Sequence, residues 1–174
     1  MVLRTKRLTV RNIEEDDWQS VRDIWSDFNA SAFAKYDKPH SVCDEDVRAR
    51  ISKWAKASEG TEHMFFAVCL GASLIGYVAF NKRENGYEIG YCFRSDFHGK
   101  GYAKESLSAL FDYLSTAGIT KFTAGTALDN TPSAALLKSL GFEQTGTEKV
   151  SFYKDSGGND IFFDGGIFEL DKGR

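Results

Sequence analysis

Apolar residues recur along the chain with a spacing that changes from one segment to the next. Between Leu3 and Ile13, Leu8 and Val10 alternate with polar neighbours, which predicts a strand with one face in solvent. The acidic cluster 14–17 then suits a helix start, because negative charge is favourable at the amino end of a helix dipole. A second helix should open near Asp44. The apolar positions at helical spacing are Trp18, Val21, Trp25 and Phe28 in the first helix, and Val47, Ile51, Trp54 and Ala55 in the second.

The middle of the chain changes to short, nearly continuous apolar runs. They cover residues 64–70, 74–80 and 87–93, and turn-forming sequences at 71–73 and 85–86 separate them. Three strands joined by short turns predict an antiparallel meander.

The second half alternates between the two patterns. Residues 99 to about 117 have apolar positions at helical spacing, and 121–128 form a strand pattern. Thr131 is the expected N-cap of a short helix over 134–140, with Pro132 at its first position and Gly141 ending it. Two last strands, 148–154 and 160–170, flank the turn 156–159. The whole order predicts a mixed sheet with helices packed against it.

Composition restricts the kind of protein. The 174 residues suit one domain, and the net charge of −3 argues against a nucleic-acid partner. Three cysteines without paired spacing predict neither a disulfide framework nor a metal site, and favour a reduced, cytoplasmic location. The first residues contain no apolar run that would form a signal peptide or a membrane anchor.

One segment, 93–103, combines the features of an anion site. A buried strand ends at Phe93, a polar loop follows, and a long helix begins near Gly99 and Gly101. The first turn of a helix leaves N–H groups unpaired, and glycines let a phosphate approach the backbone. Arg94 and Lys100 would add positive charge at the rim. The alternative, that the two glycines only form a tight turn, stays open.

Two familiar phosphate-binding motifs do not fit this segment. A Walker A loop needs Ser or Thr after its lysine, whereas Gly101 follows Lys100. A dinucleotide-binding fingerprint needs a third glycine at the position that Lys104 occupies.

The segment from His98 to Ala103 resembles the acyl-CoA pyrophosphate loop of the GCN5-related N-acetyltransferases (GNAT), and is most similar to the RimJ/RimL branch. The sequences 130–133 and 140–142 resemble a second motif of that family at the family's spacing, and 3–11 and 88–91 resemble two of its strands. The chain departs from the pattern at His98, where Gln or Arg is usual, and at Leu137, where a related group has a tyrosine.

The resemblance implies a single mixed α/β domain over residues 1–174, with a central, mostly antiparallel sheet flanked by about four helices. It implies an enzyme that transfers the acetyl group of acetyl-CoA to a primary amine, without a metal. The strand 87–93 should splay from its neighbour. The residues it assigns to the cosubstrate are Tyr91, Cys92 and Phe93 for the thioester and pantetheine, His98, Gly99, Lys100, Gly101, Tyr102 and Ala103 for the pyrophosphate, and Asn130 for the pantetheine arm.

The catalytic roles are less specific. Glu88 is the candidate base because it lies on the strand that should carry the thioester, and Ser133 is a candidate proton donor to the departing thiolate, by resemblance to the RimL-like branch. A solvated strand carboxylate, a first-turn serine and, for Asn130, a turn residue are the structural alternatives. Cys92 as a nucleophile is the less favoured alternative to a core residue, because no activating group stands near it in sequence. His40 and His63 show no ligand spacing and are expected on loops or at the surface.

The acceptor is the part that the sequence constrains least. A protein or peptide N-terminal α-amine is the leading expectation, because an α-amine needs only about 1.4 kcal/mol to lose its proton at pH 7 and a lysine about 4.6. A small amine such as a polyamine, amino acid or antibiotic is the first alternative, and a non-catalytic acyl-CoA-binding module is the second. The two N-terminal helices and the region 30–43 should form the acceptor side, where Phe28, Phe33 and Tyr36 line a pocket or pack in the core. A homodimer stays open.

Overall fold

A computed structural model describes residues 1–173, and within them eight strands form one sheet. Their order across the sheet is β1-β2-β3-β4-β5-β6-β8-β7. Every neighbouring pair is antiparallel except β5 and β6, which the helix α3 connects as a parallel pair. The strands are β1 (Val2–Arg4), β2 (Thr9–Asn12), β3 (His63–Leu70), β4 (Ser73–Arg83), β5 (Gly86–Phe93), β6 (Lys121–Ala127), β7 (Glu143–Lys154) and β8 (Asp160–Asp171).

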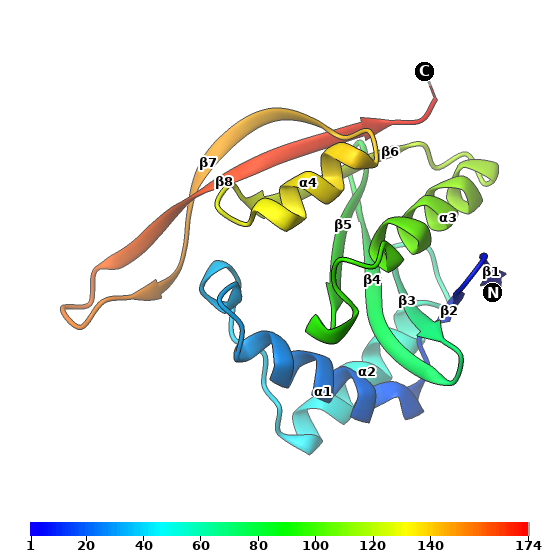
Figure 1. Cartoon of the computed structure of the whole chain (residues 1–174), viewed down its shortest axis with the longest axis horizontal. Coiled ribbons are helices and arrows are strands. Elements are labelled where there is room, and N and C mark those ends of the chain that lie inside the picture. Colours follow the sequence, from blue (N-terminus) through cyan, green and yellow to red (C-terminus); the bar gives the residue numbers. More distant parts are fainter. Residues whose placement is uncertain (174) are drawn as a thin grey trace.

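Four α-helices cover the two faces of the sheet (Figure 1). They are α1 (Trp18–Asn29), α2 (Asp44–Ala57), α3 (Tyr102–Thr116) and α4 (Thr131–Ser139), with short 3-10 helices η1 (Glu15–Asp17), η2 (Ala34–Tyr36) and η3 (Ser95–Phe97). Helices α1 and α2 pack on one face through Trp25, Ile51 and their neighbours, and α3 and α4 pack on the other through Phe111 and Leu137. The predicted mixed, mostly antiparallel sheet with helices on it is therefore confirmed, as is the meander of β3, β4 and β5.

The first predicted strand is wrong in one respect, because it is a hairpin rather than one strand. β1 and β2 pair antiparallel, and the turn between them is closed by the Thr5 N–H donating to the Leu8 carbonyl at 2.9 Å. The Thr5 hydroxyl also accepts from the Leu8 N–H at 2.9 Å. Apolar and polar residues alternate only at 7–11, and the preceding run 4–7 is entirely polar, which is the local signal of the turn.

Two predicted helix starts also need correction. Gly99 and Gly101 have φ of 70° and 81°, which is left-handed backbone, so α3 begins only at Tyr102. Asn130, not Thr131, is the N-cap of α4, because its side-chain oxygen accepts from the Ser133 N–H at 3.3 Å. Thr131 is then already helical. The predicted end of this helix at Gly141, which has φ of 92°, is confirmed.

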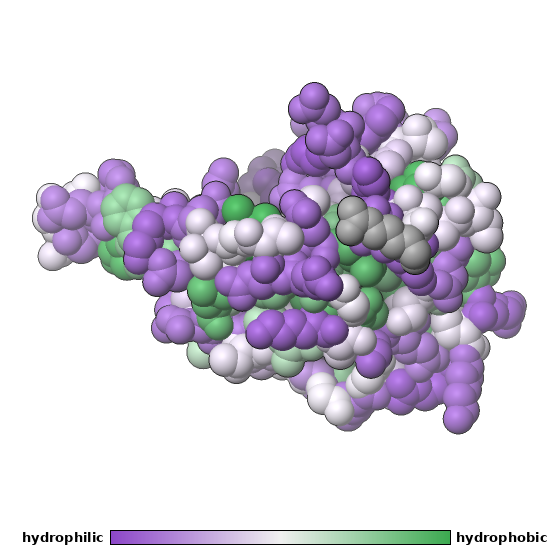
Figure 2. All heavy atoms as spheres, turned by 90° about the horizontal axis from the view of Figure 1, so that it is seen from above, coloured by the Kyte–Doolittle hydropathy of each residue, from purple (hydrophilic) through white to green (hydrophobic). Residues whose placement is uncertain are grey.

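Strands β7 and β8 extend beyond the rest of the sheet as a hairpin arm (Figures 1 and 2). β7 is longer than predicted, because its pairing with β8 begins at Glu143. Near the tip of the arm, Ile161 and Phe162 are exposed, while Tyr153 donates from its hydroxyl to the Ala34 carbonyl at 3.2 Å. The arm therefore reaches back to η2, in the loop between α1 and α2.

Candidate active site

The sheet opens between β5 and β6. These strands pair only at Tyr87 with Phe122 and at Glu88 with Thr123, and no pair within residues 1–173 continues the ladder toward Phe93. The remainder of β5 keeps its partner β4 on the other side. This separation is the splay that the resemblance implies.

The orientation of the β5 main chain follows from one hydrogen bond. The Arg94 N–H donates to the Ile75 carbonyl of β4 at 3.0 Å, and this pair continues the register of β4 and β5. Opposed residues of an antiparallel ladder alternate in their bonding, so Cys92 pairs with Tyr77 while the main-chain groups of Tyr91 and Phe93 point away from β4. Tyr91 therefore presents its N–H and C=O to the opening between β5 and β6.

The loop at the end of β5 offers unpaired donors. Within the described part of the chain, no hydrogen-bond acceptor is found for the amides of Gly99 and of residues 101–104. No side chain caps α3, and an added Cβ at Gly99 would meet no atom within 4 Å. An open cradle of amides at the positive end of a fifteen-residue helix suits a diphosphate.

The side chains of this loop brace it internally. His98 donates from Nε2 to the Phe93 carbonyl at 2.8 Å, since a carbonyl can only accept. Lys100 Nζ donates to the Asp96 carbonyl at 2.7 Å, and Arg94 pairs with the Asp96 carboxylate at 2.6 Å. Both predicted rim cations are thus present at the loop, but each already has an acidic or carbonyl partner.

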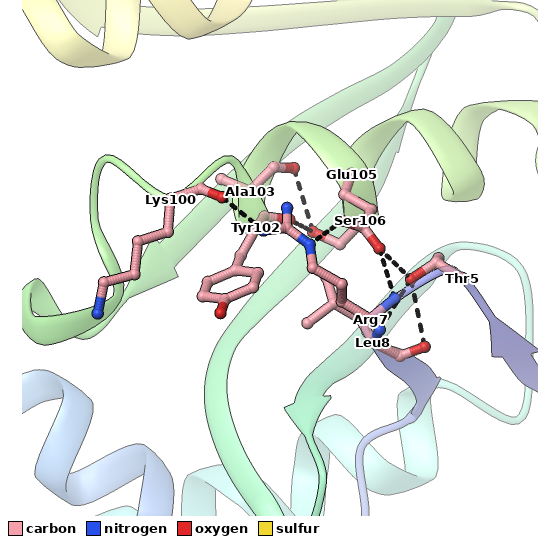
Figure 3. A network of polar contacts seen from close by, with 8 residues as sticks. All are labelled: Thr5, Arg7, Leu8, Lys100, Tyr102, Ala103, Glu105 and Ser106. Carbon is pink, nitrogen blue, oxygen red and sulfur yellow. Dashed lines mark hydrogen bonds and ion pairs between the residues drawn. The ribbon is translucent and has the colours of Figure 1, made fainter.

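Arg7, which the sequence did not single out, also lies against this loop (Figure 3). Its guanidinium donates to the Lys100 carbonyl at 2.9 Å and to Glu105 Oε2 of α3 at 2.7 Å. The only sequence signal was its place in the Arg-Leu-x-x-Arg stretch of the first strands, which named no role.

Two hydroxyl groups meet across the opening. Tyr91 Oη lies 2.8 Å from Ser133 Oγ in the first turn of α4, although only the Tyr91 main chain was predicted to take part. Burial raises the pKa of Tyr91, and the hydrogen bond with Ser133 opposes that shift only in part. The Tyr91 phenol therefore stays protonated at neutral pH. Asn130 has the structural role left open for it, since its side-chain oxygen caps this same turn.

Glu88 lies at the closed end of the splay. It is the last β5 residue that still pairs with β6, and Arg83 Nε donates to its carboxylate at 2.8 Å. Its side chain is 44% exposed. Glu88 is therefore a solvent-accessible, ion-paired carboxylate three residues before Tyr91.

Cys92 points to the opposite face of the sheet from Tyr91, toward the core under α1 and α2. Burial, with smaller contributions from Asp27 and Asp37, raises the pKa of its thiol to about 12. A neutral, buried thiol is not an activated nucleophile, so the structure favours the core role for Cys92.

The loop 30–43 and the arm line an open cavity of about 620 Å³. Its lining residues are Ala34, Lys35, Tyr36, Asp129, Tyr153, Lys154, Ile161, Phe162 and Phe163. Of the three aromatics proposed for a pocket, only Tyr36 lines this cavity. Phe28 instead packs against the His40 ring.

The two other histidines lie where they were expected. His40 is in the loop after η2 and stacks on Trp25 with 4.9 Å between ring centroids, and His63 is exposed at the start of β3. No group of three or more potential metal ligands occurs within residues 1–173. In the same residues, no helix is both long and apolar enough to cross a bilayer.

Comparisons with known proteins agree with this geometry. Residues 7–143 match the family model described as the acetyltransferase (GNAT) domain. An uncharacterized N-acetyltransferase of Bacillus subtilis, YnaD, is 32% identical over 151 residues, which cover 84% of this chain and 85% of that protein.

Solved structures share the fold over the whole chain. A GNAT-family acetyltransferase from Bacillus anthracis superposes with a TM-score of 0.80 at 26% identity, covering 100% of both chains. RimL, a ribosomal L7/L12 α-N-protein acetyltransferase solved in complex with coenzyme A, gives a TM-score of 0.85 at 20% identity and 98% coverage of both chains. The match of family model, relatives and fold identifies an acetyl-transferring enzyme. This chain belongs to the GNAT family of acetyltransferases.

Proposed function

We propose that this enzyme uses acetyl-CoA to acetylate the α-amino group of a peptide or protein. The observation that carries the proposal is that the loop with unpaired amides adjoins the opening between β5 and β6. The amides of Gly99 and residues 101–104 lack partners, and the opening between β5 and β6 leads to that loop. A diphosphate and an extended thioester arm need such a pair of adjoining sites.

Main-chain groups of the loop and of β5 are placed to bind coenzyme A. The amides of the loop would hold the diphosphate, and the Tyr91 main chain and the Asn130 amide nitrogen would bind the pantetheine arm. Asn130 Oδ1 is used by the cap, but its Nδ2 remains a donor. The thioester supplies the activated acetyl group.

Tyr91 and Ser133 supply two of the groups that the reaction requires. A Tyr91 N–H aimed at the thioester oxygen would stabilise developing negative charge, and one such donor is typically worth about 3 kcal/mol. The Ser133 hydroxyl, hydrogen-bonded to the buried Tyr91 phenol, would pass a proton to the thiolate as it leaves. The Tyr91 phenol would donate its proton to the Ser133 oxygen as Ser133 gives up its own. It would thereby replace the tyrosine that a related group has at the position of Leu137.

Glu88 is the proposed acceptor of the amine proton. Arg83 Nε donates to its carboxylate at 2.8 Å, and its exposure allows a water molecule to connect it to the amine. Such a weak base is adequate for an α-amine, whose pKa of about 8 is close to neutral pH, but poorly matched to a lysine near 10.4.

The cavity beside η2 and the arm supports a peptide acceptor with an apolar side chain. Tyr36, Tyr153 and Phe163 provide aromatic surface there, and Asp129, next to Asn130, provides a negative charge for an incoming ammonium group. The shared fold with RimL, a ribosomal L7/L12 α-N-protein acetyltransferase, is consistent with this acceptor class. A small amine carrying an apolar group would fit the same cavity and is the second candidate.

The test combines binding with turnover. Coenzyme A should release heat on titration and raise the unfolding temperature, because a ligand at a hundred times its dissociation constant stabilises the folded state by about 2.7 kcal/mol. Mass spectrometry should then detect acetylated α-amines in a peptide library that also contains lysine side chains, polyamines, amino acids and aminoglycosides. Binding without any turnover would instead identify a non-catalytic acyl-CoA-binding module, and turnover of small amines alone would exclude the peptide.

A further inference from the structure

Arg7 lies at the junction of three segments that are far apart in sequence (Figure 3). It belongs to the turn of the β1–β2 hairpin, and its side chain reaches the glycine loop and the first turn of α3. The main-chain N–H of Arg7 donates to Glu105 Oε1 at 2.9 Å, and its Nε donates to Glu105 Oε2 at 2.7 Å. The guanidinium carbon also stacks 4.4 Å from the centre of the Tyr102 ring.

The contact that bears on binding is the one to the loop carbonyl. Arg7 Nη1 donates to the Lys100 carbonyl oxygen at 2.9 Å. In a trans peptide the C=O of one residue and the N–H of the next point in opposite directions. Holding the Lys100 carbonyl toward Arg7 therefore turns the Gly101 N–H away from Arg7, and that N–H is one of the donors without a partner.

Arg7 lies against a glycine of the loop whose backbone is left-handed. Gly101 has φ of 81°, and glycine populates many backbone states at similar cost. A Cβ at Gly101 would lie 3.3 Å from Arg7 Nη2, so the arginine also packs directly on this residue. The guanidinium thus restricts the peptide plane between Lys100 and Gly101 by a hydrogen bond and by direct packing.

Glu105 and Thr5 fix the arginine in turn. Glu105 accepts from the Thr5 hydroxyl at 2.6 Å as well as from Arg7. Burial acts to raise the pKa of Glu105, but the hydrogen bonds from Thr5 and Arg7 outweigh it and leave the pKa lowered. The carboxylate is therefore charged at neutral pH and holds the planar fork of Arg7 in a single orientation.

We propose that Arg7 is a positioning residue for cosubstrate binding: it orients the Gly101 amide toward the diphosphate and adds positive charge behind the loop. This inference rests on the proposed function, because it presupposes that the loop binds a diphosphate. It assigns no contact between Arg7 and the ligand.

The experiment separates the diphosphate from the rest of the cosubstrate. Arg7→Met removes the charge and both side-chain hydrogen bonds, while its unbranched side chain can still cover Tyr102. Because a hydrogen bond that involves a charged group is worth roughly 1.5–3 kcal/mol, the dissociation constant for coenzyme A should rise by about tenfold or more. The kcat/KM for S-acetylpantetheine, which lacks the diphosphate and the adenosine, should change by less than about twofold.

Two further variants guard against a merely structural effect. Arg7→Lys keeps the charge but cannot bridge Glu105 and the Lys100 carbonyl with one planar group, so it should also weaken coenzyme A binding. Arg22→Met breaks a comparable exposed ion pair with Asp44, 2.8 Å long, away from the loop, and should leave both measurements unchanged.

The outcomes distinguish failure of the proposed function from failure of the inference about Arg7. If the wild-type enzyme binds no coenzyme A, the proposed function fails and the inference fails with it. If the wild type binds and Arg7→Met binds equally well, only the inference is overturned. Equal losses with coenzyme A and S-acetylpantetheine would also overturn it, since they would show a general structural role.

Discussion

At the scale of residues, the proposed chemistry depends on two hydroxyl groups that are 42 positions apart in the sequence. Tyr91 is buried and keeps its proton, while Ser133 lies at the start of α4 and is partly accessible. Ser133 alone would be an ordinary first-turn serine, whose N–H bonds to the Asn130 cap. The phenol beside it makes a proton-donating role chemically reasonable.

Ser133→Ala should reduce kcat by at least about tenfold with little change in the KM for acetyl-CoA, because proton transfer and not binding is lost. Tyr91→Phe should have a smaller effect in the same direction, and the double variant should lose less than the product of the two, since the hydroxyls act as a unit. Ser139→Ala, which removes a hydroxyl that bonds only to the Leu136 carbonyl at the other end of α4, is the matched control. A kcat of Ser133→Ala within about twofold of wild type would exclude Ser133 as the donor.

Glu88→Gln should lower kcat/KM and move the acidic limb of its pH profile, because the amide cannot accept the amine proton at any pH. Glu62→Gln is the matched control, since Glu62 is also exposed and ion-paired, with Lys82 at 2.7 Å. An unmoved profile for Glu88→Gln would show that Glu88 is a structural carboxylate and that the amine loses its proton to solvent.

At the scale of elements, the arm of β7 and β8 forms one wall of the proposed acceptor cavity. The arm contacts η2 through two interactions, the Tyr153 hydroxyl on the Ala34 carbonyl and the Tyr36 ring on Phe163, 5.3 Å between centroids. One side of the cavity is therefore formed by the loop that contains η2, and the other by the projecting arm. The central sheet forms neither side. Loops and hairpin ends vary without disturbing the core, which suits a surface that selects the acceptor.

Tyr153→Phe should raise the KM for the acceptor by about two- to tenfold, the range expected for a lost neutral hydrogen bond, and leave the KM for acetyl-CoA unchanged. Steady-state kinetics with each substrate varied in turn would measure both constants. Tyr113→Phe on the exposed side of α3 provides the control for loss of a tyrosine hydroxyl. A larger effect on acetyl-CoA than on the acceptor would contradict the assignment of the cavity.

At the scale of the whole molecule, the sheet consists of two ladders that meet at one end. β5 is paired with β4 along its length and β6 with β8 along its length, but β5 and β6 share only the pairs at Tyr87 and Glu88. One core cluster spans both ladders, with the Phe80 ring of β4 5.8 Å from the Phe122 ring of β6, so side-chain packing holds them together where the hydrogen bonds between β5 and β6 end. The crossover through α3 brings the positive end of that helix to the mouth of the opening.

Much of this arrangement could be predicted because it depends on residues that are close together in the sequence. The change of apolar period located most strands and helices, since burial on one face imposes a period of two or of about 3.6. Gly99 and Gly101 indicated a candidate phosphate loop because glycine lets a phosphate approach the backbone closely. The same local reasoning placed one strand over the β1–β2 turn, because the alternation at residues 7–11 was extended back across the polar run 4–7.

The sequence by itself determined most of the order of elements, the position of the glycine loop before α3, and the family. Only the tertiary structure decided that Arg7 supports that loop from 93 residues away, that Tyr91 meets Ser133, and that η2 and the arm face each other across a cavity. The physical reason is that periodicity and backbone preference act between neighbours in the chain. Contacts between distant side chains depend on how the sheet and helices pack, which no local pattern records.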